Sequence, residues 1–247
     1  MSDARTEILS RIRTALGSDA GSAGTGTVRP AAGVVPREYR AAGEHAPGSE
    51  MVLDLLVDRL EDYKAEVHRT TAADLPGVLA RVLTERSAER QVVGSSDYRS
   101  PDVLPTTRGA RRSVVVPSGL DGTWLSAVDD VDVRRDSREA PLSAAELDEA
   151  DAVITAARVA VAETGTIVLD GEPDQGRRAI SLVPDVHVCV VRTDQVAQTV
   201  PEAVRLLGAE PARPLTWISG PSATSDIELE RVEGVHGPRT LHVVLVS

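Results

Sequence analysis

The sequence is poor in cysteine, lysine and aromatic residues, and each shortage removes a class of protein. Among its 247 residues there are two Trp, three Tyr, no Phe and one Cys, Cys189. One cysteine excludes an internal disulfide and cannot supply a four-thiolate iron–sulfur cluster or a cysteine-rich zinc site. Lys64 is the single lysine, and no G-x-x-x-x-G-K-[ST] phosphate loop is present. Pyridoxal enzymes and P-loop nucleotide hydrolases are therefore disfavoured.

Positive charge and long apolar runs are also scarce. Lys and Arg total 27 against 38 Asp and Glu, which gives a formal net charge of −11. Nucleic acids and anionic membranes need a basic footprint, so neither is an expected partner. No apolar run approaches the roughly 20 residues of a membrane span, and residues 1–16 lack the basic tip and apolar core of a signal peptide. We therefore expect a cytoplasmic protein.

The residues that are abundant are those of an ordinary α/β domain. Hydrophobic residues make up 41% of the chain and charged residues 26%, and a chain of this length can bury most of its apolar surface. Short β-branched runs alternate with segments of helical periodicity, which predicts an α/β fold with a mostly parallel sheet flanked by helices. The expected strands are 66–70, 91–94, 113–116, 131–133, 152–155, 166–170, 186–191, 215–218 and 241–246, and the expected helices are 2–16, 51–60, 75–83, one opened by a capping box at 143–146, and 195–207.

Three parts are expected along the chain. Residues 1–16 form an N-terminal helix, because Ile8, Leu9 and Ile12 recur at helical spacing and Gly17 supplies a stop. Residues 17–48 form a flexible linker, since they hold seven of the 19 glycines, with an ordered anchor at 34–40. Residues 49–247 form the α/β domain.

The turn before the expected strand 166–170 is the first candidate site. Glu163, Thr164, Gly165 and Thr166 place a carboxylate and two hydroxyls around a glycine. Such a turn presents a carboxylate and backbone N–H groups at a sheet edge, where open α/β folds keep their ligand crevice. The alternative is a simple turn, since the same residue types also populate turns without function.

The hydroxyl-rich segment after the expected strand 215–218 is the second candidate. A strand that leads into a glycine and several hydroxyls at a helix start forms a nest of N–H groups that suits a carboxylate or phosphate. Alternatively, Asp226 is only the N-cap of the following helix. The segment consists of Ser219, Gly220, Pro221, Ser222, Thr224 and Asp226.

Two further loops carry polar side chains. His236 stands between two glycines, which lets the backbone approach a ligand and aims the imidazole. An ordinary hydrogen-bonding role in the loop is the alternative. Arg177 and Arg178 follow Gly176 and are able to clamp a carboxylate through bidentate guanidinium contacts, the alternative being two solvated side chains.

The remaining histidines and the cysteine do not indicate a metal site. His187 and Cys189 share one face of an apolar strand, where a core role is expected. His236 and His242 are separated by a loop and a strand start, and no H-E-x-x-H pattern exists. We therefore expect no metal bound by this chain.

Taken in order, these segments resemble the lactate-utilisation protein C family, whose members carry the LUD domain. The resemblance covers most of 129–247 and extends to the N-terminal helix, to 35–40 and to 61–65. The residues that carry it are PLS at 141–143, AETGTI at 162–167, GRR at 176–178, LVP at 182–184, SGPS at 219–222, Thr224, DIE at 226–228 and GVHGP at 234–238.

The resemblance implies a fold like that of the sugar-phosphate isomerase and CoA-transferase superfamily. It also implies an accessory or non-redox role in the cytoplasmic oxidation of L-lactate to pyruvate. Two iron–sulfur partner proteins would hold the clusters, this chain itself would bind no cofactor, and L-lactate or pyruvate is the expected ligand. We expect Glu163, Asp226 and His236 to form the catalytic cluster, and Thr164, Gly165, Thr166, Arg177, Arg178, Ser219, Gly220, Pro221, Ser222 and Thr224 to bind the anion.

Two other functions stay open. In CoA-transferase relatives a glutamate attacks a thioester, so Glu163 could serve as the nucleophile or base of a stand-alone acyl-transferase- or isomerase-like enzyme. The third possibility is a regulatory module that senses a carboxylate and uses the N-terminal helix as a docking arm. Spacing in the sequence does not decide whether Glu163, Asp226 and His236 meet in the fold.

Overall fold

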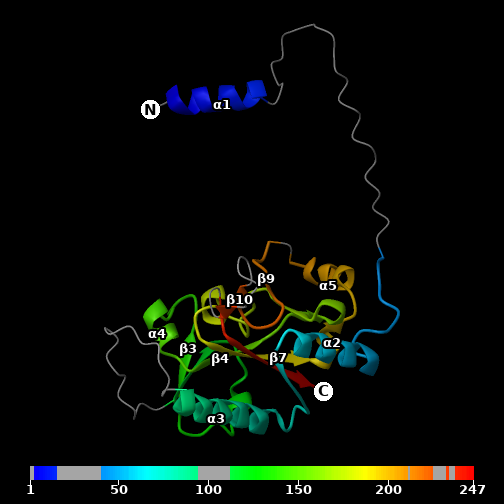
Figure 1. The fold of residues 1–247 in the computed structure, drawn as a ribbon, viewed down its shortest axis with the longest axis vertical. Helices are drawn as coiled ribbons and strands as arrows, with labels where there is room; N and C mark the ends of the chain where they lie inside the picture. Colours follow the sequence, from blue (N-terminus) through cyan, green and yellow to red (C-terminus); the bar gives the residue numbers. More distant parts are fainter. Residues whose placement is uncertain (1–2, 16–39, 94–111, 211, 225–231, 234–236) are drawn as a thin grey trace. The chain divides into compact units, whose positions relative to one another are not determined.

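The computed structural model describes residues 3–15, 40–93, 112–210, 212–224, 232–233 and 237–247, in two separate units. The first unit, residues 1–39, contains helix α1 (Asp3–Ala15), in which Ile8, Leu9 and Ile12 are exposed. The second unit, residues 40–247, contains all the other described elements (Figure 1). None of the described helices is long and apolar enough to cross a membrane.

A six-stranded, fully parallel sheet is the centre of the second unit. Its strand order is β1-β12-β7-β4-β2-β3, and every pairing is parallel. The α/β class with a mostly parallel sheet, as the sequence predicts, is thereby confirmed. The strands are β1 (Glu66–Thr70), β2 (Arg112–Pro117), β3 (Val131–Asp136), β4 (Ala152–Ala156), β7 (Val186–Arg192) and β12 (Thr240–Val246).

A second, mixed sheet of four strands has the order β8-β5-β6-β9. Its strands are β5 (Val159–Val161), β6 (Thr166–Leu169), β8 (Val196–Ala197) and β9 (Thr216–Ile218), and a short hairpin joins β10 (Ala223–Thr224) to β11 (Val232–Glu233). β5 was not predicted, because a three-residue run is too short to show alternation.

Helices and the second sheet cover the two faces of the central sheet. Helix α3 (Leu75–Val93) packs on one face through Leu75, Leu79 and Val82. Helix α2 (Glu50–Asp62) and the second sheet cover part of the other face, and α5 (Val200–Leu207) packs on the outer side of the second sheet (Figure 1). Helix α4 (Ala144–Asp148) and the single turn η3 (Arg178–Ser181) cover β2 and β4 on that same face. Further single turns are η1 (Gly122–Leu125), η2 (Ala162–Thr164) and η4 (Thr193–Gln195).

The helix and strand ends predicted from the sequence agree with the structure in some places and differ in others. The predicted capping box is confirmed, because Ser143 and Glu146 exchange both hydrogen bonds at the start of α4. The predicted strand 91–94 is wrong for residues 91–93, which continue α3; two valines are too few to interrupt a growing helix. The predicted helix 195–207 begins too early, because β8 pairs with β5 and the Glu202 carboxylate caps α5 at Thr199.

The end of the expected linker is fastened to the α/β unit. The backbone N–H of His45 donates to Gln198 Oε1 at 2.9 Å, and that of Gly48 donates to the Val196 carbonyl at 2.9 Å. Residues 40–48 are therefore held in place, whereas 16–39, including most of the expected anchor at 34–40, lie outside the described residues.

His187 and Cys189 are buried on one face of β7, as the sequence predicts. His187 Nε2 lies 2.8 Å from the buried Thr155 Oγ1 on β4. Burial lowers the pKa of His187 from 6.5 to about 4 and raises the pKa of Cys189 to about 12. Both side chains are therefore neutral at pH 7.

This burial predicts a pH dependence of stability. Between pH 6.5 and about 4 the unfolded chain binds a proton at His187 that the folded chain does not bind. The buried neutral His187 therefore contributes its full share to the free energy of unfolding above pH 6.5. As the pH falls towards 4, up to about 3 kcal/mol of that free energy is lost. Urea unfolding of the wild type and of His187→Gln at stepped pH should give curves that converge by about that amount towards pH 4. Two parallel curves would contradict this assignment.

Candidate functional site

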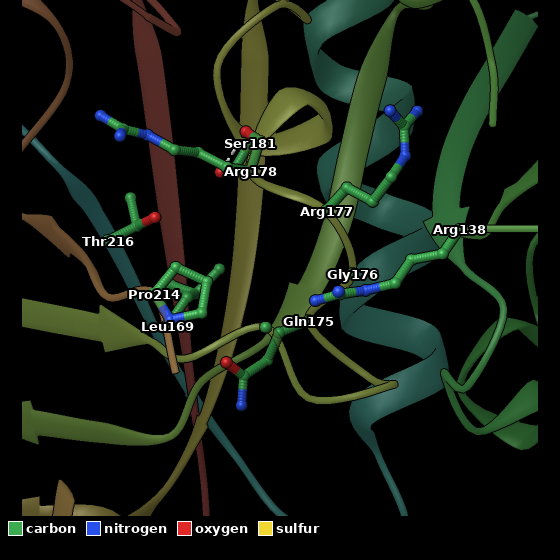
Figure 2. A pocket seen from close by; sticks show the side chains of 10 residues that line it. Arg138, Leu169, Gln175, Gly176, Arg177, Arg178, Ser181, Pro214 and Thr216 are labelled. Atoms are coloured by element: carbon green, nitrogen blue, oxygen red, sulfur yellow. Dashed lines mark hydrogen bonds between the residues drawn. The ribbon is translucent and has the colours of Figure 1, made fainter. Parts of the chain in front are cut away.

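Two adjoining pockets of about 260 and 330 Å³ lie along the contact between η3 and β9. Arg178, Ser181 and Thr216 line both, so we treat them as one groove, of which Figure 2 shows the smaller pocket. The smaller pocket also has Arg138, Leu169, Gly171, Gln175, Gly176, Arg177 and Pro214 in its wall, and the larger one has Leu182, His187, Trp217, Ile218, Ser219, Gly220, Pro221, Ser222, Gly237, Pro238 and Leu241.

Arg138 and Arg178 both line the smaller pocket, and no ion pair to a carboxylate is formed by either among the described residues; only Arg178 also lines the larger pocket. The Arg178 side chain is exposed and extends on the Thr216 side of the smaller pocket (Figure 2). The hydroxyl of Ser181 donates to the Arg178 carbonyl at 3.1 Å, which fixes the backbone of η3. A guanidinium beside the hydroxyls of Thr216 and Ser219 is suited to a small anion, since it offers paired donors in a plane.

The neighbouring Arg177 points away from Arg178 (Figure 2) and is occupied inside the chain. Its Nε donates to Asp136 Oδ2 at 2.9 Å, and its Nη2 donates to Asp136 Oδ1 at 2.5 Å and to the Leu142 carbonyl at 3.1 Å. The Asp136 side chain is 0% exposed, and its hydrogen bond raises the pKa of Arg177. Arg177 therefore joins η3 to the end of β3, and the Nε–Nη2 edge of its guanidinium is already occupied.

Glu163 lies in η2, outside the groove lining. Its carboxylate accepts from Gln198 Nε2 at 3.2 Å and forms an ion pair with Arg40. The next turn residue, Gly165, has φ +56°, and a Cβ there would come within 2.9 Å of Arg59 Cβ, so glycine is required. The carboxylate is one-third exposed and is held between two partners.

The hydroxyls after Glu163 reach the groove indirectly. Thr164 Oγ1 and Thr166 Oγ1 are 2.8 Å apart, and Thr166 Oγ1 is 2.8 Å from Ser219 Oγ. Ser219, in turn, lines the larger pocket. A hydroxyl chain therefore connects the first predicted segment to the second.

The second predicted segment lines the groove only in part. Ser219, Gly220, Pro221 and Ser222 are in its wall, whereas Thr224 belongs to β10. Gly220 has φ +81° and a Cβ there would lie 2.6 Å from Tyr63 Cβ, so this turn also requires glycine. Asp226 and His236 lie outside the described residues, so their meeting with Glu163 stays a prediction.

His187 is a groove residue that the sequence assigned only to the core. It is 1% exposed, yet it lines the larger pocket together with Leu241. Its neutral imidazole adds a polar group to a wall made of arginine, hydroxyl and apolar side chains. Because the described lining carries no carboxylate and no thiol, it suits an anion better than a metal cation.

A further crevice of about 360 Å³ lies outside the carboxyl ends of β2, β4 and β7 and shares Gln175 with the smaller pocket. The chain leaves β2 towards β3 on one side and leaves β4 towards β7 on the other, so this crevice is the switch point of the sheet. Burial raises the pKa of Asp174 there, and its buried Oδ1 has no hydrogen-bond partner among the described residues. Arg158 and Arg192 line the same crevice. Asp174 was not predicted from the sequence, where its one signal is its place in the loop after β6.

Comparisons with known proteins agree on one family. The family model described as the LUD domain matches residues 53–246. Lactate utilization protein C of Deinococcus radiodurans is 49% identical over 198 residues, covering 79% of this chain and 80% of the relative. Lactate utilization protein C of Oceanobacillus iheyensis is 24% identical over 237 residues, covering 92% and 94%. The crystal structure of a DUF162 family protein from Deinococcus radiodurans matches with TM-score 0.60 and 44% identity, covering 80% of this chain and 97% of that one.

The occupied state of Arg177 generates a stability prediction. Asp136→Asn keeps the shape of the side chain but leaves the guanidinium without its anion, and we expect a loss of about 3 kcal/mol in the free energy of unfolding. The matched control is Asp132→Asn, because Asp132 is exposed and pairs with Arg134 at 3.0 Å. That variant should lose less than about 1 kcal/mol. Equal losses in urea unfolding would show that the Asp136 pair has no special structural role.

Proposed function

The chain belongs to the LUD domain family, and on that basis we propose that it takes part in lactate utilisation, as a component of a system that oxidises L-lactate to pyruvate. Support comes from the relatives named lactate utilization protein C, among them one that is 49% identical over about four-fifths of both chains. The family match spans residues 53–246 and therefore includes every described residue of the groove.

In this proposal the groove binds the carboxylate of a small hydroxy acid or keto acid. The observation that carries it is the Arg178 guanidinium, which lines both pockets and faces no acidic partner among the described residues. The hydroxyls of Ser181, Thr216 and Ser219 would accept or donate the remaining hydrogen bonds. The chain would bind and orient the acid, with His187 as a neutral polar group in the pocket wall.

Electron transfer would belong to partner proteins. The single thiol, Cys189, is buried, and burial raises its pKa to about 12, so it is a poor thiolate ligand. The clusters that accept electrons from L-lactate are therefore assigned to iron–sulfur partners.

A docking surface for such a partner is offered by β9 and α5. β9 is an edge strand of the second sheet; Trp217 on this strand and Leu215 just before it are exposed. Trp217 also lines the groove, so a partner bound to this edge would contact the wall of the pocket that holds the acid. On α5 the side chains of Val200, Val204 and Leu206 are exposed as well.

The crevice at Asp174 favours a second candidate, a stand-alone enzyme that transfers protons. A half-buried carboxyl with a raised pKa at a sheet switch point is a common setting for a general acid or base. Asp174 would then replace Glu163 as the acid–base residue, since Glu163 is held by Arg40 and Gln198.

Ligand affinity provides a direct test of the groove. We expect L-lactate or pyruvate to bind the full chain in isothermal titration calorimetry, and Arg178→Gln to weaken that binding by about 10- to 100-fold, because one charge-assisted contact is lost. The control is Arg81→Gln, an exposed arginine on α3, which covers the other face of the central sheet. Wild-type affinity in Arg178→Gln, or no binding of either acid to the wild type, would contradict the proposed site.

The activity of the assembled system provides another test. Two iron–sulfur proteins of the system, purified anaerobically, should reduce an acceptor dye with L-lactate only when this chain is added. Arg178→Gln should restore little activity, and Arg81→Gln should restore all of it. Partners that work equally well alone would remove the subunit proposal. Loss of activity in Asp174→Asn with full activity in Arg178→Gln would move the function to the crevice.

A further inference from the structure

Two histidines and a glutamate meet on the face of the central sheet that α3 covers. Glu66 and His68 are two positions apart on β1, so their side chains share one face. His242 on β12 stands opposite Glu66 in the parallel register and has the same parity as Val244, which packs against α3. His68 and His242 are 174 positions apart, so no short sequence motif predicts this cluster.

The distances among the three side chains match those of metal ligands. His68 Nε2 and His242 Nδ1 are 3.3 Å apart, and His242 Nδ1 and Glu66 Oε2 are 3.5 Å apart. All the ligand atoms lie within 4.8 Å of one another. Because Zn–N and Zn–O bonds are about 2.0–2.2 Å long, two ligand atoms on a tetrahedral zinc ion are separated by about 3.4 Å. The exposed Glu66 side chain is free to adjust its rotamer and close the remaining distance.

The surroundings of the cluster also suit a metal ion. His242 is 2% exposed, His68 is half-buried and Glu66 is exposed, so the cluster is closed on the protein side and open towards solvent. Both histidines stand on strands of a hydrogen-bonded sheet, which holds their backbones at a fixed separation. Two imidazoles and one carboxylate form a donor set that divalent transition metals prefer over Mg²⁺ or Ca²⁺.

We propose that Glu66, His68 and His242 bind one divalent transition-metal ion, for which Zn²⁺ is the probe. The ion ties the edge strand β1 to β12 and keeps at least one coordination position open to solvent. The site is independent of the carboxylate groove, because Leu241 lines the groove on one face of β12 and His242 lies on the opposite face. The inference therefore goes beyond the proposed function and stands or falls separately.

The test is a titration of the tag-free full chain, freed of metal by dialysis against a chelator. We expect one Zn²⁺ per chain in calorimetry, and Co²⁺ in its place should give the visible absorption of a low-symmetry nitrogen and oxygen site. His68→Gln and Glu66→Gln should each weaken Zn²⁺ binding at least tenfold. The matched control is His45→Gln, which should bind as the wild type does because His45 lies in the segment before α2.

His68 and Glu66 are chosen because they are not fully buried, whereas replacement of the buried His242 threatens the fold. Circular dichroism of each variant checks that the sheet is intact. The proposal is overturned by an absence of saturable Zn²⁺ binding, by wild-type affinity in His68→Gln or Glu66→Gln, or by an equal loss in His45→Gln. Arg178→Gln should bind Zn²⁺ normally, so failure of the carboxylate site and failure of the metal site are distinguishable.

Discussion

Insertion of the last strand, β12, between β1 and β7 is the constraint on which the rest of the arrangement depends. β12 pairs in parallel with both neighbours, and its alternating residues enter both cores, Leu241, Val243 and Leu245 on one face and Val244 and Val246 on the other. The same insertion puts Leu241 into the groove wall and His242 beside Glu66 and His68. One strand therefore contributes to both halves of the core and to two of the polar sites, because a buried parallel strand presents a side chain to each face at every second position.

A single buried carboxylate decides how the arginine-rich loop is used. Asp136 at the end of β3 accepts from the Nε and Nη2 of Arg177, and burial of that anion makes the pairing costly to break. The contact between Arg177 and Asp136 holds the start of η3 against the end of β3. The next side chain, Arg178, lines the groove. Adjacent residues of the same type thus differ in their surroundings: Arg177 is engaged inside the chain, and Arg178 is the residue to which the proposal gives the ligand-binding role.

The polar sites occupy different regions around a sheet whose interior is almost wholly apolar. A cationic groove rich in hydroxyls lies on one face, a cluster of imidazole and carboxylate lies on the other, and Asp174 stands at the carboxyl ends of the strands. Inside the sheet, burial keeps His187 and Cys189 uncharged. Charge is therefore confined to the margins, where ligands have access, since an unpaired charge in the interior would carry a large desolvation cost.

The sequence by itself determined the α/β class, most strands, the capping box at Ser143 and the core role of His187 and Cys189, because these depend on local hydrogen bonds and on the period of apolar residues. It also selected the segments that hold Ser219 and Arg178. Only the tertiary structure separated Arg178 from Arg177 and placed Glu163 with Arg40 rather than in the groove. Only the strand order brought His242 to His68, across 174 positions. Contacts of that kind follow from which strands pair, and no local spacing encodes the order of a parallel sheet.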